Sequence, residues 1–294
     1  MPEIGIGNKP IDDGNYLFTP AEKDAFVALE PHAARYFRRW LGADEFINGY
    51  ERWCLWRGDC SPSELRRMPE AMKRVDAVRR FRLASRSAPT KKLAATPTRF
   101  HVENIPDTDF LAIAKVSSER RAFVPMGYLD PTTLASDLLF VMPHATRFHF
   151  GVLCSTMHNA WVRYTCGRLE SRYRYSKDIV YNNFPWLEAP TAKQRAANEA
   201  AAQAVLDARA QFPGSSLADL YDPLTMPPAL VKAHQALDAA VDAAYGRKSF
   251  RNDAERVAFL FELYQRYTSL LPMPAKTPQV PRSKPGPASA PNGT

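Results

Sequence analysis

The composition of the chain changes sharply after Trp186, and this change limits the fold more than any other feature. Upstream, short apolar runs are separated by Gly, Pro and Asp, which is typical of short strands in a compact mixed domain. Downstream, residues 191–211 are rich in Ala with Gln, Glu and Arg, a composition that favours helix. We therefore expect an α+β fold, in which a mixed helix and short-strand domain over residues 1–186 precedes a small all-α domain over residues 187–271.

The expected elements follow from hydrophobic periodicity and from Gly and Pro breaks. In the first domain we predict helices over Pro20–Leu41 with a break at Pro31, over Ser61–Ser85 with a break at Pro69, and over about 148–166; strands over 46–57, 99–102, 110–116, 122–126 and 137–141; and a loop over 86–98. In the second domain we predict helices over 191–211, 228–244 and 253–271. Residues 272–294 are rich in Pro, Lys, Ser and Thr, and we expect them to form a disordered tail.

Positive charge is concentrated in residues 61–100. This segment holds 11 Lys and Arg against 3 Asp and Glu, an excess of 8 that equals the net charge of +8 of the whole chain. A local block of cations is what binding to nucleic-acid phosphates requires. The alternative interpretation is a solvated helix whose cations simply face water.

Residue types that carry catalytic or metal chemistry show no organised pattern. No pair of the 4 cysteines has Cys-x-x-Cys spacing, and the 6 histidines form no His-x₃-His motif. We therefore expect no catalytic residue and no metal ligand in this chain, and we interpret the cysteines as reduced residues of a cytoplasmic protein. The sequence contains no signal peptide and no apolar run of transmembrane length, so we expect no membrane partner.

The segment Gly167–Asp178 carries charged side chains at alternate positions: Glu170, Arg172 and Arg174. In an extended chain, alternate side chains share one face. Arg donates to guanine O6 and N7 in the DNA major groove, and Glu accepts from cytosine N4, so this face has the groups that read base edges. The alternative is a solvated strand face on which Glu170 and Arg172 form a local ion pair.

Several longer blocks point to one protein family. The chain resembles the target-recognition domain and C-terminal part of the MmeI-like (type IIL) restriction–modification proteins, which are single-chain adenine-N6 DNA methyltransferases. The resemblance runs from Gly7 to about Leu271. Its blocks are Gly7–Gly14, Phe46–Trp56, Ala95–Phe100, Val116–Arg121, Met157–Arg163 and Tyr173–Trp186. In this family, the positions matching Glu170 and Arg172 act as a base-reading pair, and the position matching Arg174 is a further reader.

Two motifs that such a methyltransferase needs are not recognisable in this chain. They are a glycine-rich loop after a strand, which holds S-adenosylmethionine, and an Asn/Asp-Pro-Pro-aromatic tetrapeptide, which grips the flipped adenine. Pro227-Pro228 is followed by Ala229, and Asn183-Phe184-Pro185-Trp186 has the wrong order. We therefore expect S-adenosylmethionine to bind a methyltransferase region in the same or a neighbouring polypeptide, and no cofactor to bind this chain.

Three functions remain open at this point. The first is sequence-specific recognition of double-stranded DNA as the specificity part of an adenine-N6 methyltransferase, with Glu170, Arg172 and Arg174 reading bases. In that interpretation the DNA-backbone contacts are Lys73, Arg79, Arg80, Arg82, Lys91, Lys92, Arg99, Lys115, Arg120 and Arg121. The second is a free-standing enzyme, which is disfavoured because no nucleophile–base or metal constellation is present. The third is a degenerate remnant that acts only as a protein-interaction module.

Overall fold

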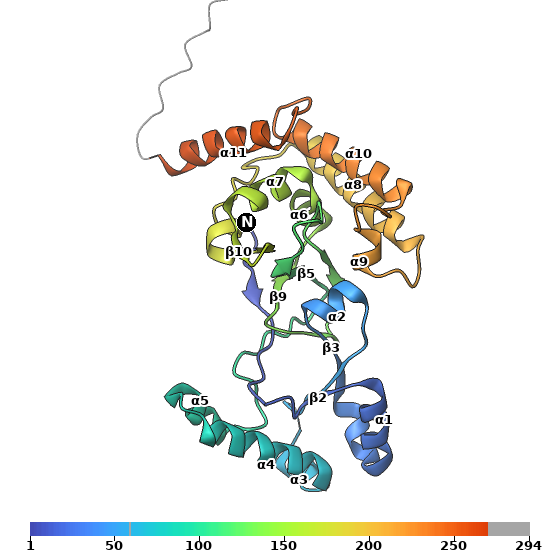
Figure 1. Cartoon of the computed structure of the whole chain (residues 1–294), viewed down its shortest axis with the longest axis vertical. Helices are drawn as coiled ribbons and strands as arrows, with labels where there is room; N and C mark the ends of the chain where they lie inside the picture. The colour runs from blue at the N-terminus through green and yellow to red at the C-terminus, as the bar shows by residue number, and fades with distance from the viewer. Residues whose placement is uncertain (59, 270–294) are drawn as a thin grey trace, which may run out of the picture.

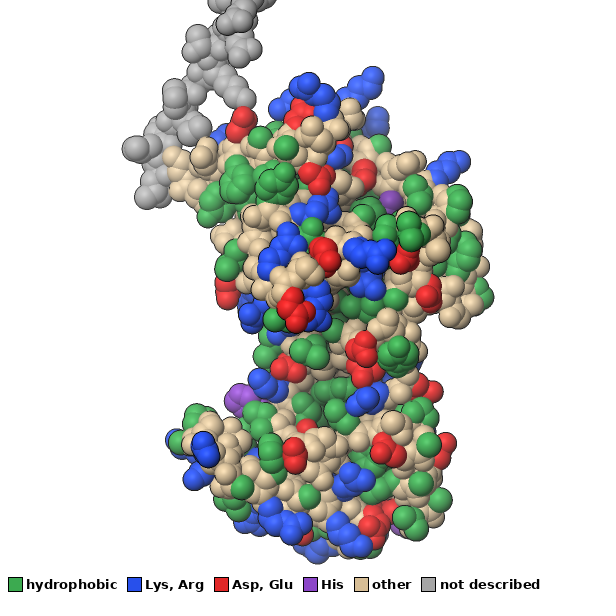
Figure 2. All heavy atoms as spheres, in the orientation of Figure 1, with side chains coloured by type: hydrophobic (Ala, Val, Ile, Leu, Met, Phe, Trp, Pro, Cys, Tyr) green, Lys and Arg blue, Asp and Glu red, His purple; other side chains and the backbone are tan. Residues whose placement is uncertain are grey.

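In the computed structural model, which describes residues 1–58 and 60–269, the strands form three small sheets. They lie along an elongated molecule whose surface narrows between a lower and an upper lobe (Figures 1 and 2). Helices accompany the sheets, and the last part of the described chain is helical, so the expected α+β fold class is confirmed. The tail expected over 272–294 lies outside the described residues. None of the helices in residues 1–58 and 60–269 combines the length and the hydrophobicity of a transmembrane span.

The lower lobe is built on a four-stranded sheet in the order β2-β4-β3-β8, with apolar side chains buried on both of its faces. Thr19 and Ser61 cap the N-termini of helices α1 and α3, because the hydroxyl of each accepts the main-chain N–H three residues further on. The elements are β2 (Leu17–Phe18), α1 (Pro20–Leu29), η1 (Pro31–Tyr36), β3 (Phe37–Leu41), β4 (Trp53–Leu55), α3 (Pro62–Leu65), α4 (Pro69–Ala84), α5 (Ala88–Lys92), η2 (Leu93–Ala95) and β8 (Leu134–Ala135).

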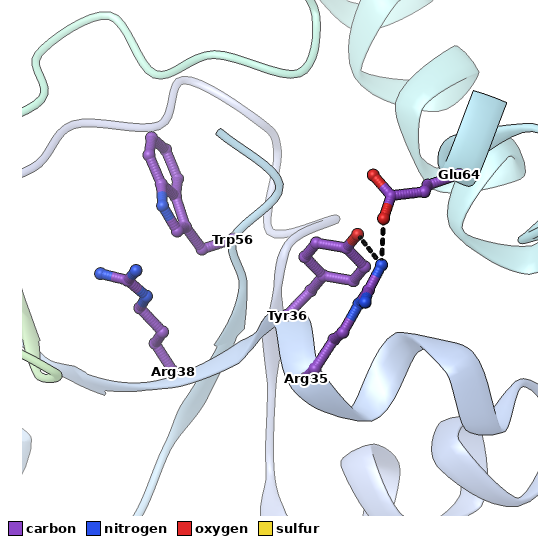
Figure 3. Close-up of a pocket in the computed structure, with 5 residues that line it drawn as sticks. All are labelled: Arg35, Tyr36, Arg38, Trp56 and Glu64. Atoms are coloured by element: carbon purple, nitrogen blue, oxygen red, sulfur yellow. Dashed lines mark hydrogen bonds and ion pairs between the residues drawn. The ribbon is translucent and has the colours of Figure 1, made fainter. Parts of the chain in front are cut away.

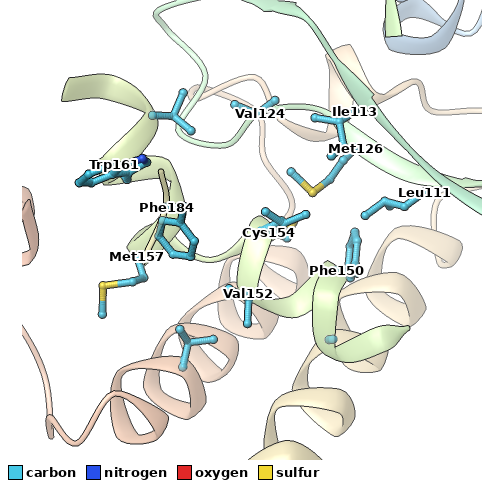
Figure 4. Packing of buried hydrophobic residues seen from close by; sticks show 14 of the residues in the cluster. Leu111, Ile113, Val124, Met126, Phe150, Val152, Cys154, Met157, Trp161 and Phe184 are labelled. Atoms are coloured by element: carbon cyan, nitrogen blue, oxygen red, sulfur yellow. The ribbon is translucent and has the colours of Figure 1, made fainter. Parts of the chain in front are cut away.

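The upper lobe is centred on an antiparallel sheet in the order β1-β9-β5-β7. Successive side chains of β5 point to opposite faces of this sheet. Leu111 and Ile113 join the large core that contains Phe150 (Figure 4), whereas Ala112 packs with Ile47 on the other face. The elements are β1 (Gly5–Ile6), α2 (Ala43–Asn48), β5 (Phe110–Ala114), β7 (Met126–Leu129), β9 (Leu139–Pro143), α6 (Arg147–Cys154) and α7 (Thr156–Thr165).

A third sheet carries the segment that the sequence analysis assigned to base reading. Its order is β10-β11-β6, and both pairings are antiparallel. The strands are β6 (Val116–Ser117), β10 (Gly167–Leu169) and β11 (Arg172–Arg174), and the π-helical turn η3 (Lys177–Tyr181) follows them. Because β6 continues the chain from β5 with only Lys115 between them, the third sheet is tied directly to the central one.

The C-terminal helices share the core of the upper lobe. Val205 and Val241 belong to the same buried cluster as Phe150. Arg209 donates to the Met126 carbonyl at 2.8 Å and to the Tyr221 hydroxyl at 2.6 Å, so partly buried hydrogen bonds link α8 to β7 and to the segment after α9. The elements are α8 (Ala192–Ala210), α9 (Leu217–Leu220), α10 (Pro228–Ala244) and α11 (Asp253–Thr268).

Several expected elements are wrong in detail. Residues 37–41 form strand β3 instead of extending the helix from Pro20, because they pair with β4 and β8. The strand expected over 46–57 is limited to β4, because residues 46–48 are the end of helix α2. Gly49 ends that helix in the left-handed conformation, with a φ of 76°. The helix expected over 148–166 breaks at Ser155, whose extended backbone and hydroxyl begin α7 instead.

Two further corrections concern the lower lobe and its neighbour. The expected loop over 86–98 contains helical turns α5 and η2, and the expected strand over 99–102 makes only an isolated bridge from Val102 to Lys9. The strand expected over 122–126 starts only at Met126, where β7 pairs with β5. For β7 the strand partner, which is distant in sequence, decides where the strand begins.

Candidate nucleic-acid interface

The segment Gly167–Arg174 is a tight hairpin and not the single extended strand that the sequence analysis expected. Leu169 pairs with Arg172, so Glu170 and Ser171 form a two-residue turn. Glu170 has a φ of 56°, the positive value that such tight hairpin turns require of a turn residue. Alternation along one strand therefore does not place Glu170 beside Arg172.

The hairpin nevertheless brings these two side chains together. Arg172 Nη2 donates to Glu170 Oε2 at 2.8 Å, and the Glu170 side chain is 77% exposed while that of Arg172 is 46% exposed. Arg172 and Arg174 lie two apart on β11 and share one face of it, as expected. The result is an exposed carboxylate–guanidinium pair at the hairpin tip, with a second guanidinium further along the strand.

The root of the hairpin is fixed by buried contacts. Tyr175 directly follows β11; its hydroxyl is paired with His158 Nε2 at 2.9 Å, and its N–H donates to the Lys115 carbonyl at 2.8 Å. Complete burial lowers the pKa of His158 to about 3, so its ring is neutral near pH 7. Tyr173, on the side away from the readers, lies under the Arg168 guanidinium at 4.0 Å. The side chains of Glu170, Arg172 and Arg174 thus project from a hairpin whose root is buried.

Lys115 lies close to the root of the hairpin. Its ammonium group sits over the Phe140 ring at 4.8 Å, and partial burial lowers its pKa while Asp137 opposes that shift and Arg174 reinforces it. Asp137 is a neighbour that the sequence analysis missed, because only the pairing of β5 with β9 brings it near Lys115. Lys115 therefore shares the charged surface of Arg174.

The basic block forms the exposed side of α4 and the turn that follows it. In Figure 1, α5 lies at the edge of the lower lobe. Of the side chains expected to contact the DNA backbone, those of Lys73, Arg79, Arg80, Lys91 and Lys92 are exposed. Figure 2 shows Lys and Arg side chains gathered on this lobe below the narrowed waist. Lys73 is partly neutralised by Glu70 at 2.7 Å, whereas no ion pair within 4.0 Å is present for Arg79 or Arg80 among the described residues.

Arg82 does not belong to this surface, and its assignment to the DNA backbone is wrong. Its side chain is fully buried, with 0% exposure. It donates to five main-chain carbonyls at 2.7–3.0 Å: those of Pro10, Ile11, Leu93, Thr96 and Arg99. Arg82 therefore joins the N-terminal segment to the chain that follows α4. The periodicity of α4 places it with Val75 and Val78 on the buried face.

The remaining cations assigned to the backbone differ in exposure. Arg99 is exposed but is engaged by Glu103 at 2.5 Å and by the Gly58 carbonyl at 3.0 Å. Arg120 is exposed. Arg121 is half-buried, and this burial lowers the pKa of its guanidinium. The negative charge of Asp222 in the helical domain partly offsets that shift. Arg121 is therefore only partly accessible to a DNA backbone.

A hollow of about 280 Å³ in the lower lobe was not expected from the sequence (Figure 3). Arg35 extends along it and donates to the Tyr36 hydroxyl and to Glu64, while Arg38 and Trp56 line the opposite side. Hydrogen bonds from Ser61, reinforced by Arg35, lower the pKa of Glu64 to about 2, so this carboxylate stays ionised and is unsuited to proton transfer near pH 7. No group of three or more His, Cys, Asp or Glu that could hold a metal ion occurs in residues 1–58 and 60–269.

Comparison with known proteins decides the family. Residues 1–188 match the family described as "MmeI, target recognition domain", and residues 190–272 match "MmeI, C-terminal domain". The chain belongs to the MmeI family. The resemblance inferred from the sequence blocks is thereby confirmed.

Two relatives show how much of a longer protein this MmeI-family chain corresponds to. "DNA methyltransferase A" of Bacillus subtilis (strain 168) is 37% identical over 268 residues, which cover 91% of this chain and 30% of that protein. A solved structure, "Structure of Type IIL restriction-modification enzyme MmeI in complex with DNA has implications for engineering of new specificities", is 51% identical with a TM-score of 0.90; the match covers 92% of this chain and 36% of that one. The MmeI-family chain thus spans 30–36% of these two relatives.

Proposed function

We propose that this MmeI-family chain recognises a DNA sequence on behalf of a type IIL restriction–modification methyltransferase. The observation that carries the proposal is the exposed Glu170–Arg172 pair at the tip of a hairpin whose root is buried. The match to a target-recognition domain and to an MmeI structure solved with DNA supports it. These matches do not favour a role limited to binding another protein.

The pair is suited to reading a single C·G pair. Arg172 would donate to guanine, and Glu170 would accept from cytosine N4, while Arg174 would contact a neighbouring base. A carboxylate is repelled by phosphates, so an exposed Glu170 on the DNA-facing surface is better explained by contact with a base edge. The ion pair holds both groups in place before DNA arrives, which lowers the entropy lost on binding.

The lower lobe would supply the contacts that carry no sequence information. Arg79, Arg80, Lys91 and Lys92 are exposed cations on α4 and α5, and their charges would neutralise phosphates and set the register of the protein on the duplex. The hairpin and α5 lie toward the same side of the molecule in Figure 1, on either side of the waist. A duplex spanning the waist would meet both surfaces.

The chemistry would be supplied by a methyltransferase region in the same or a neighbouring polypeptide, and we propose that S-adenosylmethionine binds there. This region is the partner of the chain, and the pair would act in the cytoplasm, where the four free cysteines of the chain stay reduced.

Selection from a library of randomised duplexes tests the proposal. The purified chain is mixed with the library at low salt, and the bound duplexes are sequenced after several rounds. We expect one short motif to be enriched. Binding without enrichment of any motif would show that the chain attracts DNA without reading it, and absence of binding would contradict the proposal altogether.

A further inference from the structure

We propose that Glu119 and Arg120, on the turn that follows β6, form a second base-reading pair beside Glu170 and Arg172. This inference rests on the proposed function and extends it, because Arg120 was assigned above to the DNA backbone and Glu119 to no role. It names two further residues that determine specificity.

The strand register places this turn at the hairpin tip. Val116 pairs with Arg174 and Ser117 with Tyr173, so the chain leaving β6 runs antiparallel to β11 toward the hairpin turn. Continued by two residues, this register sets Glu119 opposite Ser171. Ser118 then begins a tight turn, in which its hydroxyl accepts the Arg120 N–H at 3.2 Å and its carbonyl accepts the Arg121 N–H at 3.1 Å. Glu119 and Arg120 are both exposed there.

The charges around Glu119 match this placement. Its carboxylate is held ionised by its own main-chain N–H and by the Ser171 hydroxyl, with Arg168 and Arg120 adding attraction, and these contacts lower its pKa. Ser171 therefore lies between two carboxylates, Glu170 and Glu119. The tip presents two acid–guanidinium groupings and not a uniformly basic surface.

Contacts with α7, α10 and α11 hold the residues that follow this turn. Side chains that recognise a base need such a supporting framework. Arg163 donates to the Ala122 carbonyl at 2.8 Å and is itself held by Asp253 of α11 at 2.6 Å. The Phe123 ring stacks on His234 of α10 with centroids 4.0 Å apart. These contacts use the C-terminal helices to fix the residues that follow Glu119 and Arg120.

The Val124 N–H adds a further anchor, because it donates to Asn159 Oδ1 at 2.8 Å. The anchored base and exposed tip of this loop repeat the arrangement of the reading hairpin. Neighbouring strands lie about 4.8 Å apart and base pairs about 3.4 Å apart, so side chains from adjacent strands can reach adjacent base pairs. A carboxylate in this position would repel phosphate, which leaves a base edge as the favourable contact for Glu119.

Selection from randomised duplexes with the full 294-residue chain tests the inference. Glu119→Lys should change the preferred base at one position of the motif, and Glu119→Gln should relax the preference there by roughly 10-fold or more. The affected position should differ from the one governed by Glu170 and Arg172. Glu199→Lys on α8 is the matched control, since it makes the same charge change away from the tip and should leave the motif unaltered.

The outcomes separate the two proposals. If the unaltered chain selects a motif and both Glu119 variants select the same one, the second reading pair is refuted while the first stands. If the unaltered chain selects no motif, the proposed function fails and the second pair fails with it. Should Glu119→Lys unfold the chain in a thermal melt, the near-isosteric Glu119→Gln decides between the outcomes.

Discussion

Arg172, the first residue of β11, donates at 2.8 Å to Glu170, which belongs to the two-residue turn before that strand. The contact depends on the positive φ of Glu170, which bends the chain back at that residue. A pair built in this way is set by the turn and is already formed in the absence of DNA. The carboxylate and the guanidinium therefore have a defined relative geometry in the chain alone.

Arg82 should act as a structural residue and not as a DNA contact. We expect Arg82→Met to destabilise the chain by about 3 kcal/mol or more, because five main-chain carbonyls in buried or partly buried hydrogen bonds lose their donor. Arg79→Met, on the exposed side of the same helix, should change stability by less than about 0.5 kcal/mol. Urea unfolding followed by circular dichroism measures both variants, and equal stabilities would contradict the role of Arg82.

DNA binding should depend strongly on salt. If roughly four to six cations meet phosphates, affinity should fall about 10²-fold or more between 50 and 200 mM salt. Arg79→Glu with Arg80→Glu should weaken binding to all duplexes alike and reduce the salt dependence. Lys248→Glu with Arg251→Glu makes the same charge change in the exposed segment before α11 and should have a much smaller effect. Equal effects of the two double variants, measured by fluorescence anisotropy, would remove α4 from the interface.

The buried His158 should make stability depend on pH. Its pKa of about 3 in the folded chain lies below the ordinary value of 6.5, so the unfolded chain takes up a proton that the folded chain refuses. The stability contributed by the neutral ring is complete above pH 6.5 and is lost progressively as pH falls toward 3, by about 1.4 kcal/mol per pH unit. His158→Asn lacks this titration. As the pH falls from 6.5 to 4.5, the difference in unfolding free energy between the unaltered chain and the variant should therefore decrease by about 1.4 kcal/mol per pH unit. A difference independent of pH would be incompatible with a neutral buried ring.

The sequence predicts the fold class well because the Ala-rich composition after Trp186 and the capping residues are local signals. It fails where a distant partner decides the structure. Residues 37–41 have the spacing of a helix but become β3, since Leu134–Ala135 pairs with them from almost a hundred residues away. The break at Ser155 has a similar origin, because Asp238 of α10 holds Thr156 through its hydroxyl and its N–H.

In the candidate site, too, residue types can be predicted from the sequence, whereas their positions depend on contacts with residues that are distant in sequence. The charged residues of Gly167–Asp178 are visible in the sequence, but their geometry depends on a hairpin turn at Glu170 that alternation does not predict. A count of cations cannot separate Arg82, which is buried, from Arg79 and Arg80, which are exposed. Glu119 lacks any local signal, because the register between β6 and β11 alone brings it to Ser171.

We expect Glu170 and Arg172 to specify a base pair instead of merely attracting DNA. Glu170→Lys combined with Arg172→Asp reverses the polarity of the pair and keeps its net charge at zero. General attraction to phosphates should survive this exchange, and each good contact supplies roughly 1–3 kcal/mol of discrimination. The double variant must first show the same thermal unfolding as the unaltered chain.

Sequencing of the duplexes that this double variant selects is the most direct measurement. We predict that the preferred base pair inverts from C·G to G·C at one position of the motif, while the other positions stay as they are in the unaltered chain. Retention of the parental motif by the folded variant would show that Glu170 and Arg172 form a surface ion pair without a reading function, and loss of all DNA binding would show that they attract DNA without specifying it.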